Sequence, residues 1–156
     1  DKVFSNAALH WMKSPIDVAQ GVYNILKPGG IFVAEFGANG NCNKVVQALE
    51  KELQHRDIPF ENPWYFPTLE EYSNLLNQCG LHILHSRVFD RLTPLNSDIE
   101  TWIQMFGQTF FRYATTSQKN DVIKDVISKL TTSLLKKDVW HVDYVRIQIV
   151  AQKLDK

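Results

Sequence analysis

Residues 5–11, Ser-Asn-Ala-Ala-Leu-His-Trp, combine three kinds of side chain that can act on a bound molecule. Asn6 can hydrogen-bond a carboxylate or an amine. His10 could orient or deprotonate a ligand, because histidine titrates near neutral pH. The ring of Trp11 could attract a cation by about 0.5 to 2 kcal/mol. This segment is therefore a candidate wall of a ligand crevice.

Each of these residues also has a structural interpretation. Asparagine is favoured in turns merely because it tolerates their backbone conformations. A lone histidine beside a tryptophan is more often a structural hydrogen-bonding group, and Trp11 could pack under the element that follows. The residue types alone leave both interpretations open.

A second group of candidates lies in residues 58–67, Ile-Pro-Phe-Glu-Asn-Pro-Trp-Tyr-Phe-Pro. Three prolines forbid regular structure there, and the aromatic side chains would be costly to expose. Trp64, Tyr65 and Phe66 could shape an apolar pocket and exclude water, or they could cap the core. Trp102 has the same ambiguity, and Arg91 and Arg112 could pair with an acidic ligand.

The first 36 residues read as strand, helix and strand. Residues 2–5 form the first strand, and residues 14–17 (Ser-Pro-Ile-Asp) have the features of a helix N-terminus. The helix continues to about residue 26, and Lys-Pro-Gly-Gly then forms a turn. The apolar run 31–36 is typical of a strand covered on both faces of a parallel sheet. Ligands bind beyond the carboxyl ends of such strands, which places residues 5–11, Glu35 and Phe36 at one crevice.

The later elements are predicted from periodicity and capping. A helix follows residues 37–40, and Thr68 with Glu71 begins another that ends before Gly80. Ser97 with Glu100 caps a helix whose apolar stripe extends to Tyr113. A further helix covers about 118–136. Residues 81–91 mix apolar and charged positions as a strand would, and residues 139–152 alternate apolar and polar side chains. These two predicted strands could pair antiparallel.

Composition narrows the class of protein. The 156 residues are 44% apolar, enough for one compact domain with a substantial core. Lys plus Arg equals Asp plus Glu at 17 each, so no positive field favours nucleic acid or an anionic membrane. No apolar run could cross a bilayer. Cys42 and Cys79 have no paired spacing, so we expect no disulfide scaffold, no metal site and a cytoplasmic location.

Two motifs carry a resemblance to a known family. Residues 3–11 (Val-Phe-Ser-Asn-Ala-Ala-Leu-His-Trp), a helix, and residues 26–36 (Leu-Lys-Pro-Gly-Gly-Ile-Phe-Val-Ala-Glu-Phe) resemble the fourth strand, fourth helix and fifth strand of class I S-adenosylmethionine-dependent methyltransferases. The trans-aconitate and malonyl-carrier-protein methyltransferase group is the most similar. Its members also have stretches similar to residues 63–67 and to the long last strand.

The resemblance implies a fold. It is a Rossmann-like α/β sheet of parallel strands flanked by helices, with a closing strand inserted antiparallel between the fifth and sixth strands. Residues 1–156 would be a single domain, the C-terminal part of such a methyltransferase. Within it, residues 92–137 would be a helical insertion that covers the acceptor.

The resemblance also implies S-adenosylmethionine as cofactor and methyl transfer to a small-molecule acceptor. The expected reaction is O-methylation of a carboxylate. A carboxylate is already ionised and needs no base, whereas an amine or hydroxyl more often needs one, so the acceptor type decides how His10 is interpreted. The implied roles are catalytic for His10, cofactor-binding for Ser5, Asn6, Ala7 and Trp11, and substrate-binding for Phe36, Trp64, Tyr65, Phe66 and Trp102.

Part of the family pattern cannot be located. The glycine-rich turn after the first strand and the acidic residue ending the second have no counterpart, and Gly-Ala-Asn-Gly at 37–40 reads as a turn. We therefore expect the chain alone to be inactive. It would need a missing N-terminal cofactor-binding segment or a pairing chain at the edge of residues 2–5. The alternative is a non-catalytic methyltransferase-like module that binds a partner or a small molecule.

Overall fold

The computed structural model describes residues 1–154, which form two compact units. The first, here called the sheet unit, contains residues 1–41, 64–90 and 145–154. The second, the helical unit, contains residues 42–63 and 91–144, and so includes the segment predicted as a helical insertion. Two long strands contribute residues to both units.

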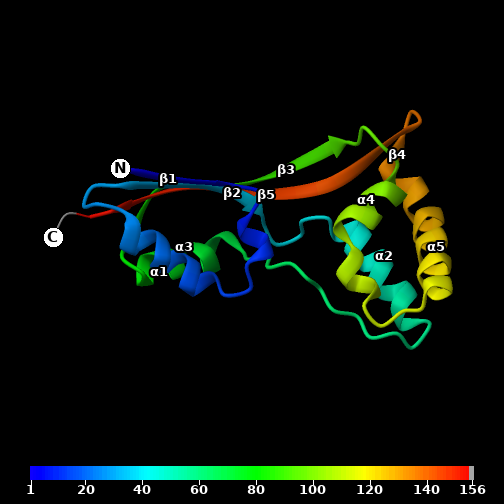
Figure 1. Ribbon diagram of the computed structural model, residues 1–156. Coiled ribbons are helices and arrows are strands. Elements are labelled where there is room, and N and C mark those ends of the chain that lie inside the picture. The colour runs from blue at the N-terminus through cyan, green and yellow to red at the C-terminus, as the bar shows by residue number, and fades with distance from the viewer. Residues whose placement is uncertain (155–156) are drawn as a thin grey trace. The chain divides into compact units, whose positions relative to one another are not determined.

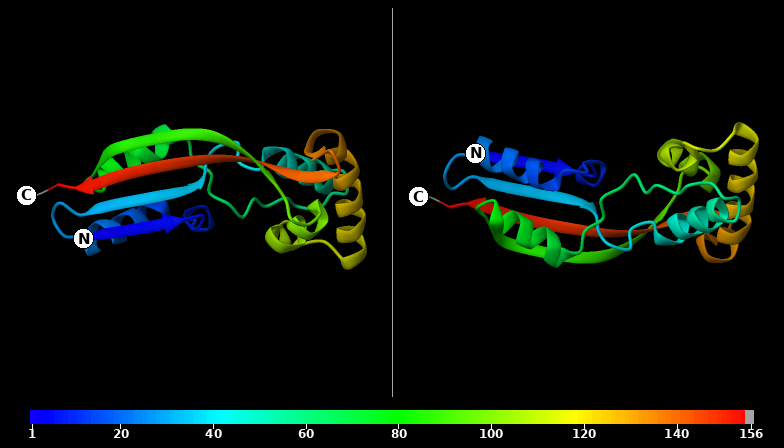
Figure 2. Two further views of the ribbon diagram at one scale, coloured as in Figure 1. Left: turned by 90° about the horizontal axis from the view of Figure 1, so that it is seen from above. Right: turned by 90° about the horizontal axis from the view of Figure 1, so that it is seen from below.

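The strands have the order β1-β2-β5-β3. Their bounds are β1 (Lys2–Asn6), β2 (Ile31–Gly37), β3 (Leu81–Pro94) and β5 (Val139–Lys153). β1 pairs parallel with β2, and β5 pairs antiparallel with β2. Figure 2 shows β3 and β5 running in opposite directions. The closing strand therefore lies antiparallel between its two neighbours, which confirms the topology that the resemblance implied.

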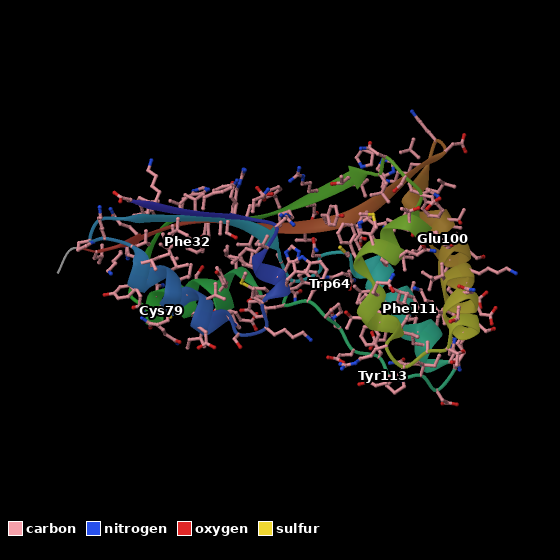
Figure 3. All side chains as sticks on the ribbon, in the orientation of Figure 1. Phe32, Trp64, Cys79, Glu100, Phe111 and Tyr113 are labelled. Carbon is pink, nitrogen blue, oxygen red and sulfur yellow. The ribbon has the colours of Figure 1, made fainter. Side chains whose placement is uncertain are left out.

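Two helices cover one face of the sheet unit, α1 (Pro15–Ile25) and α3 (Leu69–Gln78) (Figure 1). Alternate residues of β2 and β5 point to this side and are buried, as Figure 3 shows for Phe32. α3 begins with the predicted capping box of Thr68 and Glu71. α1 begins at Pro15 as predicted, but the side chain of Ser14 makes no capping hydrogen bond. The core contains Phe32, Ala34, Phe36, Ile147, Ile149 and Ala151.

The opposite face of β1 and β2 is not covered by a helix of the sheet unit within residues 1–154. Burial alternates along β2, so the prediction of a strand covered on both faces is wrong for the described chain. Phe4 lies opposite Val33, and Val33 lies opposite Val150, so the three share this face. Phe4 is 73% exposed. Val33 and Val150 are partly buried, so Phe4 supplies most of the exposed apolar surface among these three residues.

The helical unit consists mainly of helices. They are α2 (Asn43–Gln54), α4 (Ile99–Phe106), the 3-10 helix η2 (Gln108–Phe111) and α5 (Thr116–Leu134). α2 and α5 pack side by side in this unit (Figure 1). β4 (Leu135–Lys136) forms a hairpin with the start of β5. The turn between them places Lys137 and Asp138 at positive φ, a conformation usually signalled by glycine or asparagine, so the sequence did not predict it.

Two predictions for the helical unit are corrected. Asp98 rather than Ser97 caps α4, because its Oδ1 accepts a hydrogen bond of 2.7 Å from the Thr101 N–H. The helix predicted to reach Tyr113 ends at Phe106, because Gly107 closes the last turn by donating to the Ile103 carbonyl. Within residues 1–154, no helix has the length and apolar character that a membrane span requires.

Candidate functional site

His10 is the centre of the candidate site. It lies in the 3-10 helix η1 (Leu9–Trp11), just beyond the carboxyl end of β1, and is 8% exposed. The backbone N–H of Gly37, beyond the end of β2, donates a hydrogen bond of 3.2 Å to His10 Nδ1. Nδ1 therefore carries no proton, and the neutral ring carries its proton on Nε2. Burial, with the nearby positive charge of Arg146, lowers the pKa of His10 to about 4, so the ring is neutral at pH 7.

The ring of His10 and three aromatic rings form a closed chain of contacts. His10 lies 5.6 Å from Trp11 and 5.8 Å from Phe66 between ring centroids. Trp64 completes the chain at 5.6 Å from Trp11 and 5.5 Å from Phe66. Figure 3 shows Trp64 beside η1. We call these four residues the aromatic cluster.

The aromatic cluster is tied to the backbone as well. The N–H of Tyr65 donates a hydrogen bond of 2.8 Å to the His10 carbonyl. Trp64 is buried, Phe66 is partly buried and Trp11 is 45% exposed. The structure thus brings together five of the predicted site residues, and one of the rings remains accessible to a ligand.

Gly37 makes this close arrangement possible. A Cβ atom at this position would lie 2.5 Å from the Phe66 ring and 2.8 Å from Asn41 Nδ2. Such distances are far below van der Waals contact, so only glycine lets the Phe66 ring approach this backbone. The same residue supplies the N–H that fixes the His10 ring.

The residues predicted to bind the cofactor lie at the end of β1. Ala7 has a φ of 55°, a left-handed conformation that is uncommon without glycine and typical of strained functional turns. Its N–H donates a hydrogen bond of 2.8 Å to the Glu35 carbonyl and so joins the ends of β1 and β2. Ser5 is partly buried and Asn6 is exposed. Their roles in binding a cofactor stay predictions.

Two predicted substrate-binding residues are found in packing contacts instead. Phe36 is fully buried in the core of the sheet unit, with its ring 4.8 Å from that of Tyr72. Trp102 lies in the helical unit, where its Nε1 donates a hydrogen bond of 2.8 Å to Tyr144 Oη. These contacts account for both aromatic side chains without a ligand, and their substrate roles stay predictions.

A buried ion pair that the sequence analysis missed lies at the same end of the sheet. Arg146 is 7% exposed, and its Nε lies 3.4 Å from Glu35 Oε1. Its Nη2 lies 3.5 Å from the Glu35 carbonyl, and Gln148 donates to Glu35 Oε2. The sequence does contain a signal for this pair, because Glu35 interrupts the apolar run 31–36 and Arg146 lies between two apolar residues of the last strand. Only the pairing register of β2 and β5 shows that the charges are neighbours.

Among the described residues, no group of three or more His, Cys, Asp or Glu side chains could hold a metal ion. Arg112, which the sequence offered as a partner for an acidic ligand, lies 3.8 Å from Glu61 in the helical unit. At the carboxyl ends of β1 and β2, Asn6, His10 and Arg146 supply an amide, an imidazole and a guanidinium, and Asn6 is exposed whereas His10 and Arg146 are buried.

Comparison with known sequences identifies relatives. No family model matches the chain. The chain is 35% identical to an uncharacterized methyltransferase of Schizosaccharomyces pombe, over 98% of this chain and 62% of the relative. It is 31% identical to a tRNA U34 carboxymethyltransferase of Hydrogenovibrio crunogenus, over 66% of this chain and 30% of the relative. The chain thus spans less than two thirds of the length of either relative.

Solved structures share the fold. A protein of Bacillus halodurans assigned as a methyltransferase superposes with a TM-score of 0.60 at 17% identity, covering 99% of this chain and 64% of that protein. A loganic acid methyltransferase with SAH gives a TM-score of 0.61 at 11% identity, covering 99% of this chain and 62% of that protein. At such low identity these similarities concern the fold alone.

Proposed function

We propose that this chain, a member of the class I S-adenosylmethionine-dependent methyltransferases, supplies the acceptor side and part of the cofactor crevice of an enzyme that methylates a small-molecule carboxylate. The observation that carries the proposal is the state of His10. The ring is neutral, and its Nδ1 is occupied by the Gly37 N–H.

The protonation of His10 bears on the kind of acceptor. An amine or hydroxyl acceptor more often needs a base to remove its proton, whereas a carboxylate arrives ionised. In the tautomer that the Gly37 hydrogen bond selects, His10 has no free basic nitrogen and can only donate through Nε2–H. A hydrogen-bond donor without a base suits a carboxylate acceptor.

The residues at the end of β1 fit part of the cofactor. S-adenosylmethionine supplies a methyl group on a positively charged sulfonium when it is bound. The exposed amide of Asn6 would bind its methionine end, near the turn at Ser5 and Ala7. The accessible ring of Trp11 would face the sulfonium. Trp64, Tyr65 and Phe66 would keep water out, because methyl displacement depends mainly on alignment and a dry site.

The remaining part of the cofactor site lies outside this chain in our proposal. The glycine-rich turn of the family has no counterpart in residues 1–156. We propose that a further segment or a pairing chain binds along β1, which lies at the end of the described strand order and exposes Phe4. This chain alone would then bind the cofactor weakly.

Methyl transfer to a carboxylate can be tested by the stability of the product. The protein encoded by the whole gene would be incubated with methyl-labelled S-adenosylmethionine and a mixture of small carboxylic acids. Methyl esters release volatile methanol in alkali, and methylated amines and carbons do not. We expect alkali-labile label; label only in stable products would contradict a carboxylate acceptor.

Cofactor binding is a separate test. Calorimetric titration of S-adenosylmethionine into the 156-residue chain should give weak binding or none. Submicromolar affinity would contradict the proposal that the cofactor site is shared with residues outside this chain.

A second candidate function is transfer to RNA. The 31% identity over 66% of this chain to a tRNA U34 carboxymethyltransferase supports it. The balance of 17 basic and 17 acidic side chains opposes it, because backbone phosphates are usually met by an excess of Lys and Arg. Label recovered in added tRNA, and none in the acids, would favour this candidate.

A further inference from the structure

We propose that Arg146 and the Nε2–H group of His10 together bind the carboxylate of the acceptor, and that Glu35 occupies the guanidinium until the acceptor arrives. This inference rests on the proposed function, since it names the residues that would recognise an anionic acceptor at the same site. It assigns a role to an ion pair that the motifs did not predict.

The ion pair between Arg146 and Glu35 fits loosely. Arg146 reaches Glu35 through Nε at 3.4 Å and through Nη2 at 3.5 Å, both at the outer limit of a hydrogen bond. A tight guanidinium–carboxylate pair has two parallel bonds of about 2.7 to 2.9 Å. Nη1 of Arg146 makes no hydrogen bond to any of residues 1–154. The guanidinium therefore retains donors for a second carboxylate.

The backbone of Gly37 fixes the orientation of the His10 ring. Its Nδ1 is held by the Gly37 N–H, so the opposite nitrogen, Nε2, carries the proton. No residue within 1–154 accepts a hydrogen bond from Nε2. The aromatic cluster holds the ring in place on two sides. The result is a fixed neutral donor that lacks its acceptor.

The two donors are joined through Gly37 at one end of the sheet. Gly37, which binds His10, is the direct partner of Arg146 in the β2–β5 register. The Glu35 carbonyl receives both the Ala7 N–H and Arg146 Nη2. Burial and, after it, the positive charge of Arg146 lower the pKa of His10, which agrees with this placement. A bound carboxylate there would gain charge-assisted hydrogen bonds in a largely buried site.

The competing interpretation is that Arg146 only neutralises Glu35 within the sheet. The two interpretations predict opposite effects of Glu35→Gln. If Arg146 binds the acceptor, removing the competing charge of Glu35 strengthens anion binding. If the pair is only structural, the substitution loosens the sheet and gives no gain in binding.

The experiment uses succinate as the probe and succinamide as its neutral counterpart. Nitrogen-15 NMR of the chain would follow the His10 imidazole and the Arg146 Nε–H during titration. We expect saturable shifts of both signals with succinate and none with succinamide. Glu35→Gln should tighten succinate binding by about 3- to 10-fold, a change of roughly 0.6 to 1.4 kcal/mol at 25 °C.

Two further variants complete the test. Arg146→Lys keeps the charge but loses the planar fork, and should weaken succinate binding at least about 10-fold. His10→Asn keeps an oxygen that can accept from the Gly37 N–H but loses the Nε2 donor, and should weaken binding by a smaller factor. Circular dichroism would check that each variant is folded. If the Arg146→Lys variant does not fold, the direction in which Glu35→Gln changes succinate affinity still distinguishes the two interpretations.

Two outcomes would overturn the inference: succinate shifts that Glu35→Gln fails to strengthen, or no saturable shift at all. Its failure is distinguishable from failure of the proposed function. Alkali-labile methyl transfer that survives Arg146→Lys in the whole protein would leave the function and remove the role of Arg146. Succinate binding that depends on Arg146, in a protein that forms no methyl ester, would keep the role of Arg146 in anion binding and remove the proposed function.

Discussion

Gly37 is the residue on which the geometry of the candidate site depends most. Its missing side chain gives room to the Phe66 ring, and its N–H fixes the His10 tautomer. We expect Gly37→Ala to destabilise the chain by about 1 to 3 kcal/mol, because the new Cβ must displace the Phe66 ring or the backbone. Urea unfolding followed by tryptophan fluorescence would measure the loss of stability.

Gly21 provides the matched control for this substitution. It lies in α1, and a Cβ added there would meet nothing within 4 Å. Gly21→Ala should therefore stabilise the chain, by up to about 1 kcal/mol, since alanine is the better helix former. Equal effects of the two substitutions would show that the crowding at Gly37 has no consequence.

At the residue scale, the sequence predicted the identity of the site residues more successfully than their roles. His10, Trp11 and the aromatic loop were singled out by type and position, and the structure brings their rings together. The tautomer of His10 could not be predicted, because it depends on a backbone N–H 27 residues away. Arg146 was missed because its partner, Glu35, lies 111 residues away.

At the scale of elements, an ion cluster centred on the buried Glu52 joins α2 to α5. Glu52 is 4% exposed, accepts a hydrogen bond of 2.5 Å from Arg56, and also bonds Lys129. Arg56 in turn bonds Asp125 of α5. The hydrogen bond from Lys129, with the help of Arg56, lowers the pKa of Glu52. The cluster should therefore stabilise the packing of these two helices while Glu52 is ionised.

We expect Glu52→Gln to lower the free energy of unfolding by about 1.5 to 3 kcal/mol at pH 7, the range for hydrogen bonds to charged groups. Because the folded state lowers the pKa of Glu52, the stabilisation is present above the unfolded pKa and is lost as the pH falls through the folded value. Urea unfolding at pH 7 and in acid would measure both effects.

Glu50→Gln is the control, because Glu50 bonds only Gln54 at the surface of the same helix among the described contacts. This variant should stay within about 0.5 kcal/mol of the parent chain at either pH. A Glu52→Gln variant that is equally stable at pH 7 would contradict the role of the cluster. A difference that persists unchanged in acid would contradict its electrostatic origin.

The elements themselves were largely predictable where local signals decide. The capping box at Thr68 fixed the start of α3, and the proline at position 15 fixed that of α1. The α4 helix was overextended because apolar spacing continues to Tyr113, whereas the turn at Gly107 ends the helix. The β4–β5 hairpin was missed because Lys137 and Asp138 are not the usual residues for positive φ.

At the scale of the whole molecule, the strand order came from family resemblance rather than from local pattern. No periodicity in residues 139–152 shows that this strand lies between β2 and β3; the motifs at 3–11 and 26–36 implied it. The local pattern failed on the second face of the sheet. An apolar run predicts burial, but it does not say whether this chain or another provides the cover.

The uncovered face of β1 and β2 leads to a prediction about the isolated 156-residue chain. Phe4, 73% exposed, lies beside Val33 and Val150 in a contiguous apolar patch on an edge strand and its neighbours. Such patches promote association in water. We therefore expect the chain to self-associate with increasing concentration, and Phe4→Glu to weaken that association about 10-fold or more, as measured by sedimentation equilibrium.

Ile25 allows the effect of the patch to be separated from that of exposure alone. It is 71% exposed at the end of α1, on the helix side of the sheet unit, and is not part of the patch. Ile25→Glu adds the same charge and removes a similar apolar area, so it should leave the association almost unchanged. If the two variants reduce association equally, net charge is the cause. If neither does, the face of Phe4 is not an interaction surface for a second copy of the chain.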